Sequence, residues 1–386
     1  MTGQQFKPWR DLTPICLIVF LEFLAMGLPL PVLPERVHGG LGFGTFVVGL
    51  VIGAQSWATL VTRHSSGTRT DEHGPRRAVV RGLGISVLAG GLYAASYALP
   101  GGTPSLVVLL LGRVLLGIGE SLVITGALAW GVALAGRERS GLVMAWVGIA
   151  MYGALAIGSP IGSALNTSIG FVGMSVVAAL APALGFGPAL AARSVAPVGG
   201  ARLPFYRVAT MIWLPGVGLA LCAVGFGAIA AFAPLLFHSH GWAHSALAMS
   251  AFGAAFVLAR LLFGSLPDRF GGAHIAMASA AVATIGQVGM WLASSGPTAV
   301  AAAALTGLGF SLAFPSFGVE AIKRVPPQNR GVALGAYTAC FDVAMGIGVP
   351  LLGMVVATFG YSAAFGVGAV AGLASLVIAI VLAGRA

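Results

Sequence analysis

Apolar runs of about 20 residues follow one another along almost the whole chain, and short polar segments separate them. A helix needs roughly 20 apolar residues to cross about 30 Å of hydrocarbon, and lipid offers no partner to an unsatisfied backbone group. Charged residues make up only 8% of the 386 residues, whereas an ordinary soluble chain carries about 25%. The bilayer is therefore the solvent, and we predict an all-α membrane protein.

Measured against this length, the chain is predicted to form twelve transmembrane helices. The first run follows Lys7 and Arg10, as a signal peptide would. It is too long for a signal peptide and lacks a small-residue cleavage site, so we expect it to be retained as an anchor. The expected helices lie near residues 12–34, 43–63, 78–99, 104–128, 140–165, 169–192, 207–236, 245–265, 273–294, 297–321, 330–358 and 361–383.

The net charge of +10 raises the question of nucleic-acid binding, and the positions of the 20 basic residues answer it. Almost all of them fall at the N-terminus or in even-numbered connections, whereas Arg36 lies on the opposite side and Arg113 lies inside a helix. Short loops rich in Lys and Arg stay in the cytoplasm. Both termini are therefore predicted to be cytoplasmic, and topology explains the basic charge without nucleic acid.

Two polar segments repeat one another after the second and the eighth predicted helices. The first reads RHSSGTRTDEHGPRR and the second reads RLLFGSLPDRFGGAH, and their shared residues match at one constant offset of 197 positions. Membrane proteins are often built from two such related halves. We predict two pseudo-symmetric six-helix halves, residues 1–192 and 208–386, joined by a cytoplasmic linker at 193–207. The matching pairs are Arg63 with Arg260, Gly67 with Gly264, Asp71 with Asp268, and Gly74 with Gly271.

The first segment also carries the pattern G-x3-D-x2-G-x-R-R, which resembles the signature loop of the major facilitator superfamily. The resemblance spans the whole chain and implies that Asp71 latches the two halves together on the cytoplasmic face in the outward-open state. The first copy lacks the usual basic residue after the acid, whereas Arg269 supplies it in the second copy. The signature and gating residues are Arg63, Gly67, Asp71, Gly74, Arg76, Arg77, Arg260, Gly264, Asp268, Arg269 and Gly271.

The residue types of this segment also fit a turn. Asp71 precedes the third predicted helix, where the positive helix end favours an acid, and Gly67 and Gly74 permit tight turns and close helix approach. The alternative is a solvated loop that only sets topology, and the second copy at Asp268 argues against it.

Three further motifs are PVLP at 31–34, GRVLLGIG at 112–119 and GSPIG at 158–162. The last two resemble proton-antiporter motifs, and the chain as a whole resembles a bacterial branch often labelled arabinose-efflux-permease-like. The resemblance implies a secondary transporter in the bacterial cytoplasmic membrane and names no cargo. In the fifth helix it singles out Gly158, Pro160 and Gly162.

Four charged residues lie deep inside predicted helices, where a charge costs at least ~2.5–3.5 kcal/mol and persists when it faces a cavity or another charge. Glu22 and Arg113 reach a similar depth when each is counted from its own helix end, so they could meet at the midplane. Glu120 follows Arg113 by seven residues and shares its helix face. Asp342 lies near the middle of the eleventh helix, in the second half.

These four residues are predicted to form the proton-coupling and substrate cavity. Glu22 is the first candidate for the coupled proton, and Glu120 is a substrate or relay residue. An acid loses its proton more easily beside an arginine and holds it more tightly in an apolar wall, so substrate arrival could switch one state to the other. The alternative is a static pair of Glu22 with Arg113 that only locks helix one to helix four.

We therefore predict a secondary active transporter that exports a small organic solute in exchange for protons by alternating access. The alternative is a proton-coupled importer of a sugar or organic acid. An enzyme is not expected because no HExxH, GxSxG or equivalent motif is present, and the missing Walker sequence disfavours an ATP-driven pump. A non-transporting sensor or scaffold is not expected either, because it would normally carry a soluble signalling domain.

We expect a monomer whose partners are protons, a small solute and the bilayer, with no cofactor and no nucleic acid. His238, His240 and His244 fall in one predicted outer loop. No carboxylate or thiolate joins them, so they are interpreted as solvated side chains, and a metal site is the alternative.

Overall fold

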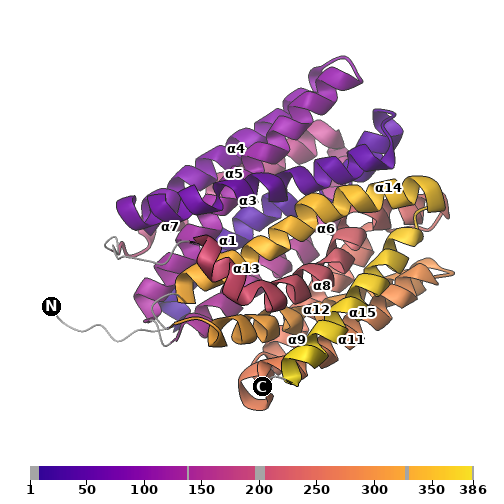
Figure 1. The fold of residues 1–386 in the computed structure, drawn as a ribbon. Coiled ribbons are helices and arrows are strands. Elements are labelled where there is room, and N and C mark those ends of the chain that lie inside the picture. The colour runs from indigo at the N-terminus through magenta and orange to yellow at the C-terminus, as the bar shows by residue number, and fades with distance from the viewer. Residues whose placement is uncertain (1–7, 137–138, 196–204, 327–329, 385–386) are drawn as a thin grey trace. The chain divides into compact units, whose positions relative to one another are not determined.

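The structure of the protein is a computed structural model that describes residues 8–136, 139–195, 205–326 and 330–384. Within these ranges every regular element is a helix (Figure 1). The elements are α1 (Pro8–Gly27), α2 (Leu33–Glu35), the π-helical turn η1 (Arg36–Gly40), α3 (Thr45–His73), α4 (Pro75–Ala98), α5 (Thr103–Ala135), α6 (Ser140–Leu184), α7 (Phe186–Ala191), α8 (Phe205–Ser239), α9 (Ala246–Phe263), α10 (Leu266–Phe270), α11 (Gly272–Trp291), α12 (Gly296–Lys323), α13 (Arg330–Val343), the π-helical turn η4 (Ala344–Gly348), α14 (Val349–Phe359) and α15 (Ala363–Ala383).

Ten stretches of the described chain are long and apolar enough to cross a membrane. One of them, Gly141–Ala191, would be roughly 75 Å long as a single helix, more than twice the thickness of the hydrocarbon. Its backbone leaves the helical conformation at Gly170, where φ is 73° and ψ is 175°, so it contains two spans. α1 is the remaining span, and it carries three charged residues, Arg10, Asp11 and Glu22. The described residues thus form the twelve spans that the sequence predicts.

Three helix ends lie seven or more residues from the predictions, and one of them is the end of α5 at Ala135, where the prediction was near 128. α1 ends at Gly27, so the PVLP motif lies beyond the first helix and not at its end. Pro29 and Pro31 follow within four residues, and proline has no N–H to continue a helix. α3 continues to His73, ten residues past the expected end, because its polar residues still form helical backbone bonds. The loop expected at 67–73 is therefore helical.

The structure divides into two compact units, which are described separately here. The first unit comprises the described residues of 1–29 and 58–200, and the second comprises those of 30–57 and 201–386. The division falls inside α3 because the first half of this helix packs against residues 345–353. Thr45 Oγ1 donates a hydrogen bond to Gly353 O at 2.7 Å. The linker expected at 193–207 lies mostly outside the described residues.

Helix pairs with close backbones build each unit. In the first unit α4 packs on α5 and α6, and α1 packs on α6. In the second unit α11 packs on α12 and α15, and α8 packs on α13 and α15. A Cβ atom at Gly82 would lie 2.7 Å from Gly119 O, so α4 and α5 touch through bare backbone. Small residues commonly serve this purpose between membrane helices.

Candidate functional site

Glu22 is buried in the first unit, where α1 contacts α4 and α5. Its side chain is 1% exposed, and Ser86 Oγ of α4 donates a hydrogen bond to Glu22 Oε1 at 2.5 Å. Glu22 Oε2 is also buried and has no hydrogen-bond partner among the described residues. A buried polar atom without a partner costs free energy. One oxygen of the carboxyl group therefore accepts a hydrogen bond, and the other accepts none from the described residues.

Glu120 of α5 is the second acid of this cluster. It acts electrostatically on Glu22. Thr59 Oγ1 of α3 is 3.0 Å from Gly117 O and 3.5 Å from Glu120 Oε2, and it can donate to either acceptor. Glu22 and Glu120 are thus close enough to interact electrostatically, and each carboxyl group has one hydroxyl group beside it.

The structure does not form the ion pair between Glu22 and Arg113 that the sequence analysis left as an alternative. The Arg113 side chain is fully buried, and its NH1 group donates to Tyr93 OH at 3.5 Å. Tyr93 and Ser86 are seven residues apart on α4, which is roughly 10 Å along the helix axis. Glu22 is bonded at the level of Ser86, about two turns from the level of Arg113.

The similar depth assigned to Glu22 and Arg113 was wrong because it was counted from the end of each helix. That count is valid only if each helix begins and ends at the membrane surface. α5 has 33 residues and is therefore roughly 50 Å long, well beyond the thickness of the hydrocarbon. Glu120, and not Arg113, lies near the middle of this helix.

Three polar partners in this region, Ser86, Tyr93 and Thr59, were not predicted from the sequence. A signal for them exists, because residues seven apart share a helix face. Ser86 and Tyr93 have this spacing on α4, and Thr59 and Ser66 have it on α3. Ser121 Oγ donates to Ser66 Oγ at 3.0 Å. Polar pairs at this spacing in apolar helices would have identified the hydroxyl groups of the site.

Asp342 belongs to the second unit. It lies in α13 and is 3% exposed. Its neighbour Phe341 contacts two other aromatic rings, with centroids 6.0 Å from Phe226 and 6.2 Å from Phe310. Burial of this acid agrees with the sequence analysis, and its role in solute or proton binding stays a prediction.

The signature segment is helix rather than loop. A Cβ atom at Gly67 would meet nothing within 4 Å, so this glycine serves neither the tight turn nor the close approach that we expected. Asp71 lies in the last turn of α3 and not at the start of the next helix. Only Gly74 has the positive φ, 88°, that a turn built on glycine needs. The latch role of Asp71 stays a prediction.

The second copy of the segment keeps this turn. Gly271 precedes α11 with φ 87° and ψ 139°, and Gly74 precedes α4 with φ 88° and ψ 150°. Gly264 has an ordinary helical φ of −59° and ends α9, so the two copies differ before the turn. Both turns require glycine because a Cβ atom is disfavoured at this φ.

The basic residues of the signature segments lie in different surroundings. Arg260 is 9% exposed, and its guanidinium lies 5.3 Å from the centroid of the Phe256 ring. Arg269 is exposed, and the side chain of Asp268 lies outside the described part of the structure. Arg63 is half-buried in α3. Arg76 NH2 donates to Leu190 O at 2.8 Å.

The GSPIG motif brings α6 against the end of α1. A Cβ atom at Gly158 would lie 3.2 Å from Gly27 Cα, and one at Gly162 would overlap the backbone carbonyl of Leu28. Pro160 lies inside α6 between these two glycines. The motif therefore positions the helix that carries Glu22.

The three histidines expected in one outer loop have different surroundings. His238 acts electrostatically on Glu35, His240 Nδ1 hydrogen-bonds to Leu236 O at 3.0 Å, and His244 has a positive φ of 63°. Among the described residues, no group of three or more His, Cys, Asp or Glu side chains could hold a metal ion.

The segment after α1 is held within the second unit by polar contacts. His38 Nδ1 hydrogen-bonds to Phe43 O at 2.8 Å, and His38 Nε2 lies 3.1 Å from Tyr361 OH. Burial raises the pKa of the Glu35 carboxyl group, and nearby His238 offsets this in part. These contacts involve residues that the sequence analysis did not single out.

Glu35→Gln should remove one pH-dependent contribution to stability. Because the folded-state pKa of Glu35 is raised, the folded protein holds this proton more tightly than the unfolded chain. The contribution is full below the usual range of a carboxyl group and is lost as pH rises through the raised pKa. Unfolding midpoints of wild type and Glu35→Gln, measured between about pH 4 and 8, report this contribution to stability. Glu72→Gln removes an exposed acid and is the control; parallel curves for wild type and Glu35→Gln would contradict the prediction.

Comparison with known proteins decides the family. The sequence profile of the Major Facilitator Superfamily matches residues 15–243 and 215–386. The chain belongs to the major facilitator superfamily. A relative from Burkholderia pseudomallei is 41% identical over 380 residues, which cover 98% of this chain and 93% of the relative. A relative from Pseudomonas aeruginosa is 42% identical over 373 residues, which cover 96% and 93%.

Both relatives are described as uncharacterized MFS-type transporters, and not as enzymes. Among solved structures, the human organic anion transporter MFSD10 matches with a TM-score of 0.71, covering 96% of this chain and 99% of that one. Its sequence identity is 16%, so this likeness shows the fold alone. The major facilitator fold is confirmed, and the protein is a secondary transporter of an unspecified solute.

Proposed function

We propose that this transporter exports a small organic solute across the bacterial cytoplasmic membrane in exchange for protons. The observation that carries the proposal is the cluster of buried Glu22 and partly buried Glu120 with Ser86 and Thr59. Two interacting carboxyl groups in apolar surroundings do not both ionise readily, so such a pair is suited to hold one proton. Glu22 holds the coupled proton, and Glu120 relays it or contacts the solute.

Alternating access would open this cluster to each side of the membrane in turn. The turns at Gly74 and Gly271, with the signature residues around them, gate the cytoplasmic side. Arg113 places a positive charge on the same face of α5 as Glu120. Asp342 tunes solute or proton binding from the second unit.

A screen followed by a flux measurement tests the proposal. Purified protein is first screened by thermal shift against sugars, amphipathic cations, organic acids and opine-like chelators, because a bound solute stabilises the native state. The solute that stabilises it is then followed in proteoliposomes with an imposed pH gradient. We expect solute to move against the direction of the protons. Movement with the protons identifies an importer, and flux that ignores the gradient contradicts proton coupling.

Reporter fusions test the orientation that export requires. Fusions at both termini and within 193–207 should report the cytoplasm, and a fusion within 236–244 should report the outside, because basic segments stay cytoplasmic. Paired reporters that are active on opposite sides of the membrane make each position its own control. One reversed position would contradict the charge argument.

A further inference from the structure

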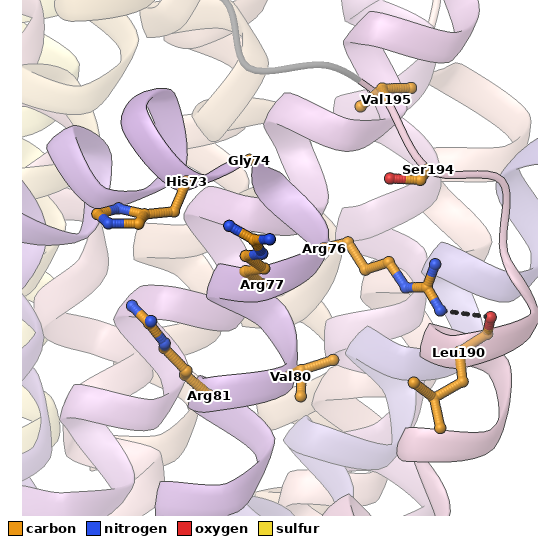
Figure 2. A pocket seen from close by; sticks show the side chains of 9 residues that line it. All are labelled: His73, Gly74, Arg76, Arg77, Val80, Arg81, Leu190, Ser194 and Val195. Atoms are coloured by element: carbon orange, nitrogen blue, oxygen red, sulfur yellow. Dashed lines mark hydrogen bonds between the residues drawn. The ribbon is translucent and has the colours of Figure 1, made fainter.

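A basic pocket opens in the first unit where α3 ends and α4 begins (Figure 2). Its volume is about 690 Å³, within the range of ~300–1,000 Å³ typical of small-ligand sites. Three arginines of α4 line it, Arg76, Arg77 and Arg81, together with His73. None of the described lining residues is acidic.

The charges in this pocket are only partly balanced. Arg76 donates to Leu190 O, and His73 lies 3.9 Å from the exposed carboxylate of Glu72. Arg77 and Arg81 have no hydrogen bond or ion pair with any described residue. They stand one turn apart on α4, and like charges at this spacing destabilise a helix. An anion between them would relieve that repulsion.

The start of α4 adds to the positive potential. Gly74 is the N-cap residue, and no side chain caps this end of the helix. The first N–H groups of a helix lack helical partners and carry partial positive charge, which favours an anion. Two guanidinium groups and a helix start therefore converge on one pocket.

The remaining side chains of the lining are apolar except for Ser194, and they come from two parts of the chain. Val80 belongs to α4, whereas Leu190 and Val195 come from the end of α7 and the residues after it. Figure 2 shows Leu190 next to Arg76 and Val80 close to Arg81, with Val195 farther away beyond Ser194. The pocket residues belong to the basic segments that the positive-inside rule assigns to the cytoplasm. A ligand here would meet guanidinium groups and apolar side chains together.

We propose that this pocket binds a phosphate-bearing anion, held by Arg77 and Arg81 and the start of α4. Guanidinium groups bind phosphate oxygens through two parallel hydrogen bonds, and basic pockets between membrane helices suit lipid head groups. The anion comes either from an acidic phospholipid or from phosphate in solution. It stabilises the α4–α7 corner of the first unit, a role separate from proton coupling at Glu22.

Thermal unfolding in detergent separates the two sources. One arm adds short-chain phosphatidylglycerol, and its control adds short-chain phosphatidylcholine. The other arm adds inorganic phosphate, and its control adds chloride at equal ionic strength, because salt screens exposed charges. We expect phosphatidylglycerol to raise the midpoint more than phosphatidylcholine. A rise with inorganic phosphate alone would assign the site to the soluble anion.

Matched variants test the residues. The double variant Arg77→Gln, Arg81→Gln should raise the apparent dissociation constant for phosphatidylglycerol by about tenfold or more, because hydrogen bonds from charged groups are lost. Arg77→Lys should retain part of the response because it keeps the charge. Arg69→Gln removes an exposed arginine of α3 outside the pocket and should respond as wild type. The proposal is overturned if phosphatidylglycerol raises the unfolding midpoint equally in the double variant and in wild type. It is also overturned if Arg69→Gln reduces this rise as much as the double variant does.

Discussion

Glu22→Gln should abolish solute accumulation driven by a pH gradient and leave solute exchange measurable. The glutamine carbonyl can still accept the hydrogen bond from Ser86, and the neutral side chain resembles only the protonated acid. The variant therefore keeps the packing of α1 but cannot release a proton. Accumulation under an imposed gradient should fall to the level of protein-free liposomes, while counterflow of labelled solute at equal pH persists.

Two further variants make this result interpretable. Glu35→Gln neutralises an acid outside the cluster and should leave gradient-driven accumulation intact. Glu120→Gln should reduce accumulation, because it removes the charge that acts on Glu22. Accumulation at the wild-type rate in the Glu22→Gln, Glu120→Gln double variant would reject the whole proton-site assignment.

Gly162→Ala should destabilise the protein by about 1–3 kcal/mol, the range expected for overpacking. The added Cβ atom would overlap the carbonyl of Leu28, and backbone atoms cannot rotate away as a side chain can. The end of α1 would have to move off α6. Since α1 carries Glu22, solute transport should fall together with the unfolding midpoint.

Gly91→Ala is the matched control for this substitution. Gly91 also lies inside a membrane helix, α4, but a Cβ atom there would meet nothing within 4 Å. Alanine is favoured over glycine in a helix by roughly 1 kcal/mol, so this variant should be as stable as wild type or more stable. Equal midpoints for the two variants would show that the contact between α1 and α6 tolerates a methyl group.

Some side-chain pairs could be predicted because they are local in the sequence. Glu320 lies near the end of α12, and its carboxylate lies 2.7 Å from Lys323 Nζ, three residues later, and 3.4 Å from Arg324 NH1, four residues later. Residues three and four apart share a helix face whatever the helix packs against. The pair of Glu22 with Arg113 had no such local constraint, and the structure did not form it.

The sequence by itself determined the membrane spans and the repeated turn. Span length and hydropathy are properties of consecutive residues, so the twelve helices could be placed to within a few residues at most ends. The glycines at 74 and 271 marked equivalent turns because only glycine adopts a positive φ at low cost.

Only the tertiary structure decided which polar groups meet. The contact of Glu22 with Ser86, and its electrostatic coupling to Glu120, depend on how far α1, α4 and α5 are shifted and rotated against one another. The basic pocket likewise joins residues 73–81 to residues 190–195, which are far apart along the chain. Shift and rotation follow from close packing of side chains across helices, which no count along a single helix contains.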